Sequence, residues 1–164
     1  EIIFTSSDQG SGTVNQWKYA DIMPSDGYIE SITLLGDAGC GPASDVTSSG
    51  RMAIEVYRQS AGTQTDLSSL SIYHTWSVRY GYANGIFGSA AGTVKTIVIG
   101  DSSTFMVAPG TRADTAFLAG DKLWFSWNPG ATTTTWKYED ASTASGAEWQ
   151  LKINYVFDDR NLDT

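Results

Sequence analysis

Few side chains in this sequence could do catalytic chemistry. His74 is the only histidine, so no cluster of imidazoles can bind zinc or iron, and a Ser-His-Asp triad would have to use this one ring. It alternates in phase with Ile72, Trp76 and Val78, which predicts a hydrogen-bonded histidine in the core or in an interface. The G-x-S-x-G, H-E-x-x-H and phosphate-loop motifs do not occur. We therefore expect that the protein is not an enzyme.

The carboxylates and the single thiol also favour structural roles. A glycosidase needs two carboxylates facing each other across a cleft, and no predicted strand carries closely spaced inward-facing acids. Cys40 is the only cysteine, so it forms no internal disulfide, and it has no basic neighbour to activate it. Residues 159–163 have the oxygen spacing that opens an EF-hand loop without its later glycine and glutamate, and residues 37–45 carry two carboxylates. Both segments are more simply solvated, and we expect no metal and no cofactor.

Aromatic side chains carry the stronger functional signal, because six tryptophans and eight tyrosines exceed what a core of this size requires. The segment 118–128, LAGDKLWFSWN, places a turn before a strictly alternating strand. Its predicted core face carries Leu123, Phe125 and Trp127. Trp124 lies on the opposite face beside Lys122 and Ser126, where core packing does not explain an indole. Since an exposed tryptophan stacks on sugar rings or anchors protein interfaces, we expect this face to be covered by something other than the core.

Four further residues are candidate contacts. Tyr82 and Phe87 lie in the glycine-rich segment GYANGIFGSAAGT, which predicts a loop that presents two large aromatic rings. Val94 and Val98 belong to the segment VKTIVI, which is apolar on both faces. That pattern predicts a central strand or one covered by a partner.

Length and composition predict one domain spanning residues 1–164. A chain of 164 residues with 41% hydrophobic side chains can bury about two-thirds of its unfolded surface. Serine, threonine, glycine, β-branched and aromatic residues dominate, which favours an all-β fold. Residues 1–14 join a short apolar strand to a Ser/Gly-rich tether, so they could form an arm that pairs within its own sheet or reaches a neighbouring subunit.

The formal net charge is −8, and no stretch clusters lysine or arginine. Such a surface repels nucleic-acid backbones and anionic membranes, so we expect no nucleic-acid partner and no membrane partner. No apolar run approaches the ~20 residues that span a bilayer.

Alternating runs separated by turn signals predict roughly eight to ten strands. The first two long runs, 15–22 and 28–36, flank the turn Pro-Ser-Asp-Gly and predict a hairpin. The remaining predicted strands are 1–4, 51–58, 70–80, 94–99, 112–118, 122–128, 132–139 and 149–157. Unequal loops favour Greek-key crossings, so we predict a jelly-roll sandwich of two antiparallel sheets. An immunoglobulin-like sandwich is the alternative, although the chain lacks the Cys…Trp…Cys spacing.

Three motifs resemble those of trimeric jelly-roll modules: A-G-D-K-L-W-F-S-W, the hairpin PSDGYIESITLL, and a final strand of the form W-x-L-x-I-x-Y-x-F. Similar modules are the tumour-necrosis-factor-like domains and the virion proteins of tailed phages, among them capsid decoration (cement) proteins and fibre knobs. The phage resemblance implies a virion structural protein that forms a homotrimer and binds the major capsid protein or another virion protein. Trp124, Lys122, Val94, Val98 and the N-terminal arm would then supply its contacts.

Two other functions stay open at this point. A glycan-binding module would use Trp124, Tyr82 and Phe87 as a stacking platform, with Asp and Asn side chains taking the sugar hydroxyls. A surface glycan could also be the ligand of a fibre tip, so this function and the virion function are compatible. A jelly-roll hydrolase would depend on His74 or on an aspartate.

Overall fold

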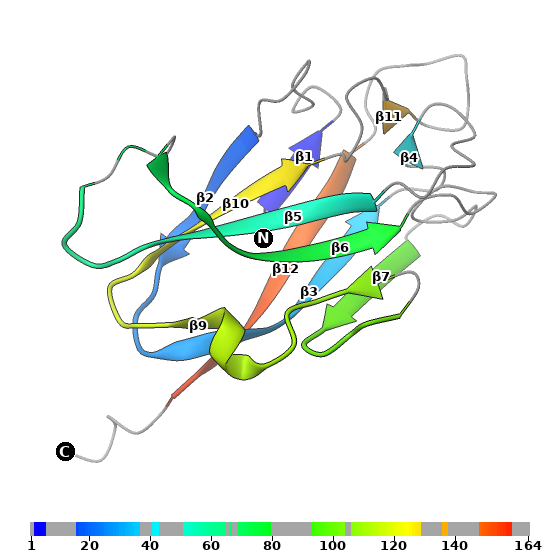
Figure 1. The fold of residues 1–164 in the computed structure, drawn as a ribbon. Helices are drawn as coiled ribbons and strands as arrows, with labels where there is room; N and C mark the ends of the chain where they lie inside the picture. Colours follow the sequence, from blue (N-terminus) through cyan, green and yellow to red (C-terminus); the bar gives the residue numbers. More distant parts are fainter. Residues whose placement is uncertain are drawn as a thin grey trace.

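Two antiparallel sheets pack face to face in this protein (Figure 1). The structure, a computed structural model, describes residues 2–5, 16–36, 41–42, 51–64, 66, 69–79, 93–103, 106–128, 136–137 and 148–158. Within these residues the all-β sandwich of two antiparallel sheets is confirmed. Its jelly-roll connectivity stays a prediction.

The first sheet has the strand order β1-β12-β3-β7. Its strands are β1 (Ile2–Thr5), β12 (Glu148–Phe157), β3 (Gly27–Gly36) and β7 (Thr93–Val98), and the short β9 (Ala116–Phe117) pairs with the beginning of β3. The longest pairing joins β3 to β12, with Gly36 opposite Trp149 at one end and Gly27 opposite Phe157 at the other.

The second sheet has the strand order β2-β10-β5-β6-β8. Its strands are β2 (Gln16–Ile22), β10 (Lys122–Asn128), β5 (Arg51–Gln59), β6 (Ile72–Arg79) and β8 (Met106–Val107). A separate two-stranded ribbon joins β4 (Gly41–Pro42) to β11 (Trp136–Lys137). Of the predicted strand 132–139, only residues 136–137 are described, and β8 lies in a part of the chain where no strand was predicted.

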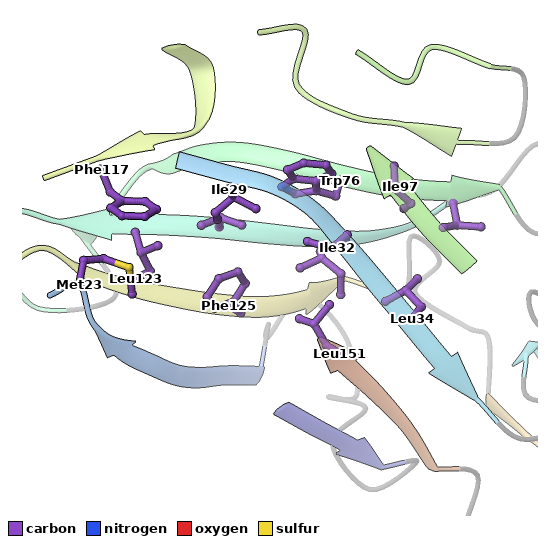
Figure 2. Close-up of a cluster of buried hydrophobic side chains, with 13 residues drawn as sticks. Met23, Ile29, Ile32, Leu34, Trp76, Ile97, Phe117, Leu123, Phe125 and Leu151 are labelled. Atoms are coloured by element: carbon purple, nitrogen blue, oxygen red, sulfur yellow. The ribbon is translucent and has the colours of Figure 1, made fainter. Parts of the chain in front are cut away.

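The core forms between the two sheets because alternating strands turn their apolar side chains toward each other (Figure 2). The first sheet contributes Ile29, Ile32, Leu34, Ile97, Phe117 and Leu151, and the second contributes Ile54, Val56, Trp76, Val78, Leu123 and Phe125. Met23, between the two sheets in sequence, completes the buried cluster. The predicted core roles of Leu123 and Phe125 are confirmed, whereas the side chains of Trp127, Trp136 and Trp149 lie outside the described residues.

The predicted hairpin between residues 15–22 and 28–36 is wrong. β2 pairs with β10 in the second sheet, whereas β3 belongs to the first sheet, so the Pro-Ser-Asp turn carries the chain from one sheet to the other. Buried Met23 lies at this corner, and its backbone is bonded to the turn before β10. Its N–H donates to the Asp121 carbonyl at 2.8 Å, and its own carbonyl accepts from Gly120 N–H at 2.8 Å. These bonds direct β2 toward β10 and away from β3.

The prediction of a central position for residues 94–99 is also wrong. β7 lies at the end of the described strand order of the first sheet, with β3 beside it. Ile97 is fully buried, while Val94 and Val98 are 53% and 46% exposed on the outer face. Cover by a partner, the other alternative, stays a prediction. A strand with apolar residues on both faces can thus lie at an edge when one face is left open.

The predicted strand 112–118 begins as a 3₁₀ helix, Arg112–Thr115, and only Ala116–Phe117 pair as β9. The Asp114 carboxylate accepts from Thr111 N–H and from Thr111 Oγ1, both at 2.8 Å. These local bonds compete with strand pairing and tighten the chain into a turn. The hydrogen bonds from Thr111 also lower the pKa of Asp114.

Candidate functional site

The residues Ala119, Gly120 and Asp121, which precede β10, form a turn that connects several elements of the fold. Buried Asp121 uses Oδ2 to accept from Arg58 Nε at 2.5 Å and from Leu118 N–H at 2.8 Å, and Oδ1 to accept from Ala61 N–H at 3.2 Å. Gly120 adopts a positive φ of 84°, which favours glycine. The carboxylate therefore connects the start of β10 to three places: β5, the turn that follows β5, and the residue that follows β9. The predicted turn before β10 is confirmed.

Trp124 lies on the outer face of the second sheet, as the alternation predicts, and is half-buried. Its Nε1 donates to Gln59 Oε1 at 3.4 Å, and Gln59 Nε2 donates to the Thr63 carbonyl at 3.0 Å. On the adjoining strand Tyr57 donates its hydroxyl proton to Glu55 Oε2 at 2.9 Å, and both residues are buried. The face is thus a polar layer largely buried within the chain itself.

Lys122 and Ser126 flank Trp124 on this face. Lys122 is half-buried, and Ser126 is fully buried with no hydrogen-bond partner for its Oγ among the described residues. Contact of Trp124 or Lys122 with a partner or a glycan stays a prediction.

The outer face of the first sheet exposes a group of aliphatic side chains beside β7. Leu35 on β3 lies directly opposite Val94 in the ladder, and Val98 lies four residues further along β7, opposite Ser31. Between them Thr33 and Thr96 face each other with their Oγ1 atoms 3.1 Å apart. We call Leu35, Val94, Val98, Thr33 and Thr96 the β3–β7 patch. The apolar pattern of residues 94–99 predicts Val94 and Val98 as contacts, whereas the part of Leu35 follows only from the pairing of β3 with β7.

A cleft of about 570 Å³ is lined by residues of β9, of the 3₁₀ helix and of the end of β12. These elements lie at one end of the sandwich (Figure 1). Its apolar lining includes Phe117, Leu118 and Phe157, and its polar lining includes Asp26, Arg112 and Asp158. Arg112 places its guanidinium carbon 5.1 Å from the ring centroid of Tyr28, a cation–π contact. The sequence does not reveal this cleft, because the residues that line it come from three separate segments. In addition, Phe157 alternates in phase with the core residues of its strand, which predicts a buried side chain.

His74 is buried, and the prediction of a hydrogen-bonded core histidine is confirmed. Its Nδ1 accepts from Trp76 Nε1 at 3.0 Å, so the neutral ring carries its proton on Nε2. Burial lowers the pKa of His74 to about 4, and the opposing influence of the Asp114 charge is smaller. The ring is therefore neutral at physiological pH.

Several predicted sites lie outside the described residues, namely Tyr82, Phe87, Cys40, residues 159–163 and most of residues 37–45. In the described part of the chain, no group of three or more His, Cys, Asp or Glu side chains is placed to hold a metal ion. No helix there is long and apolar enough to cross a membrane.

Comparison with known proteins finds no matching family model, no similar curated protein and no similar solved structure. The resemblance to jelly-roll virion proteins therefore rests on the three sequence motifs, and function has to follow from the residues and their geometry.

Proposed function

We propose that the protein is a non-enzymatic structural subunit that associates with copies of itself, as a trimer, through the β3–β7 patch. The observation that carries this proposal is the exposure, 38–53% each, of Leu35 and Val94, which lie opposite each other, and of Val98, four residues along β7 on the same sheet face. Exposed aliphatic side chains gathered on one face of a protein are typical of interaction surfaces. In line with the motifs, the assembly would stabilise a virion as a capsid decoration or fibre-type subunit, together with the major capsid protein or another virion protein.

The polar atoms of the patch favour a contact in which a neighbouring copy packs its side chains on the outer face of the sheet, and not one in which it adds a strand to β7. The Thr33 and Thr96 hydroxyls bond each other, so covering them leaves fewer unpaired polar groups than two isolated hydroxyls would. The N–H of Val98 donates to Asp101 Oδ2 at 3.0 Å, which blocks that position of the β7 edge. A neighbouring copy would therefore press against the outer face and would not extend the sheet at Val98.

In a cyclic trimer each interface joins two different surfaces of neighbouring subunits. The β3–β7 patch would form one of these two surfaces. A stable contact buries ~1,600 Å², more than these side chains alone supply, so the surrounding polar rim takes part as well. Association then stabilises the folded subunit and the particle by mass action.

Sedimentation velocity of the purified chain tests the assembly, and addition to virions that lack the protein tests the attachment. Val94→Lys and Val98→Lys should each dissociate the assembly, since an interface core excludes an unpaired charge. Ile72→Lys is the matched control, because Ile72 is 48% exposed on the other sheet. Its assembly should equal that of the unchanged chain.

A chain that remains monomeric and does not bind the depleted virions contradicts the proposal. Association that survives both valine substitutions would place the interface elsewhere. Glycan recognition through Trp124, Tyr82 and Phe87 stays a prediction. It has no support from the described contacts, because Trp124 is half-buried against Gln59.

A further inference from the structure

We propose that the cleft between β9, the 3₁₀ helix and the end of β12 binds a neutral saccharide, with its ring stacked on Phe157. This proposal is independent of the β3–β7 patch, which begins at the other end of β3 with Leu35, eight residues or ~26 Å of extended strand from Gly27. Val98, the patch residue nearest the cleft along the strand, pairs with Ser31, four residues from Gly27. The cleft volume of about 570 Å³ lies within the ~300–1,000 Å³ typical of small-molecule sites.

The apolar floor of the cleft offers a rigid aromatic surface. Phe157 is 38% exposed, although its ring stacks on Tyr155 with centroids 5.8 Å apart and planes at 27°. Phe117 contacts it from a second side at 5.9 Å and 66°. A ring that two neighbours already hold in place loses little conformational entropy when a ligand covers it. The free-energy cost of binding is lower for this reason.

Gly27 allows this floor to form. A Cβ atom at this position would collide with the Val156 carbonyl oxygen and lie 2.9 Å from the Phe117 ring. The absence of a side chain lets β3, β9 and the end of β12 approach closely enough to seat Phe117 beside Phe157. The cleft is thus shaped by the backbone and does not depend on a mobile side chain.

The rim of the cleft supplies both kinds of hydrogen-bonding group that a sugar hydroxyl needs. Arg112 lies over Tyr28, which orients its planar guanidinium and leaves N–H donors at the edge of that plane. Asp26 accepts from Ala119 N–H through Oδ1 at 2.8 Å, and a carboxylate has further acceptor capacity beyond one bond. Asp158 is fixed nearby, because its N–H donates to the Asp26 carbonyl at 2.7 Å.

The charges select against ionic ligands. Asp26 and Asp158 line the cleft with Arg112 in a protein of net charge −8, so an anionic ligand meets net repulsion. Arg112 already occupies the face of Tyr28 and repels a second cation. A neutral ring with one apolar face and a circle of hydroxyls satisfies Phe157, Leu118, Arg112 and Asp26 together.

Protein-observed NMR, with neutral hexoses, N-acetylhexosamines and their disaccharides as titrants, tests the proposal. At least one should shift the amide resonances of Arg112, Leu118 and Phe157, with a dissociation constant on the order of millimolar as expected for a small ligand in an open site. Phe157→Leu and Arg112→Gln should each weaken this binding by about fivefold or more. Ile72→Ala, which trims an exposed side chain on the other sheet, should leave it unchanged.

Three results would overturn the proposal. One is the absence of cleft shifts with every neutral sugar up to ~50 mM, and another is undiminished binding in folded Phe157→Leu and Arg112→Gln proteins. The third is a preference for glucuronate or for arginine methyl ester, which would assign the cleft to an ion. The oligomeric state, measured on the same samples, separates a failure here from a failure of the assembly proposal.

Discussion

His74 shows how burial defines the role of a side chain that the sequence singles out. Its Nδ1 accepts the indole proton of Trp76, and a second proton on the ring would remove that acceptor. The charge of Asp114 in the 3₁₀ helix raises the pKa of His74, and it does not outweigh the effect of burial. A core histidine held neutral in this way contributes to stability only while it stays neutral.

This leads to a pH-dependent prediction. The pKa of His74 is about 4 in the folded chain and 6.5 when unfolded, so between these values the unfolded state binds more protons. Stability should be complete above pH ~6.5 and fall by roughly 3 kcal/mol as the pH drops to ~4. Urea unfolding across this range measures the loss. His74→Asn keeps an acceptor but does not titrate, so equal pH slopes in the two proteins would contradict the prediction.

Asp121 is the second residue whose role is set by its surroundings. Asp121→Asn removes the charge that pairs with partly buried Arg58 and one of the acceptors for Leu118 and Ala61. The free energy of unfolding should fall by about 3 kcal/mol, since breaking a buried charge pair leaves its partner uncompensated. Exposed Glu30→Gln is the control and should stay within ~0.5 kcal/mol in chemical denaturation. Equal stabilities for both variants would refute this role of Asp121.

At the scale of elements, three strands approach closely at the junction of β3, β9 and β12. Gly27 lies there in close contact with the Val156 backbone and the Phe117 ring, whereas Gly62 lies in open space with a positive φ of 75°. The two glycines are needed for different reasons. One provides room and the other provides a backbone conformation.

Alanine substitutions separate these reasons. Gly62→Ala should lower the free energy of unfolding by about 1 kcal/mol, because a side chain is unfavourable at positive φ. Gly27→Ala should cost more, about 2–3 kcal/mol, because backbone atoms cannot yield as a flexible side chain could. Thermal unfolding of both variants gives the comparison, and a Gly27→Ala protein as stable as Gly62→Ala would show that the junction relaxes easily.

At the scale of the whole molecule, the net charge of −8 opposes assembly while the β3–β7 patch favours it. Like-charged subunits repel over about 10 Å at ~0.1 M salt, and added ions screen this repulsion. Self-association should therefore strengthen between ~0.05 and ~0.3 M sodium chloride in sedimentation equilibrium. Weakening over that range would indicate an interface held by complementary charges, and the aliphatic patch would then not be its centre.

Much of the fold follows from the sequence, because a strand records its own burial in the alternation of its residues. Leu123 and Phe125 opposite Trp124, and Leu151 in phase with Ile153, are sufficient to predict two-faced strands and a sandwich. The turn before β10 was predictable for the same reason, since its glycine and aspartate act within a few residues.

Pairing and the cleft could not be predicted, because they depend on residues far apart in the chain. Only the tertiary structure decides that β2 pairs with β10 and not with β3, that β7 exposes Val94 beside Leu35, and that Arg112 and Phe157 line the same cleft. The alternation of residues along a strand shows which of its faces is apolar, but it does not show which other strand lies beside that strand.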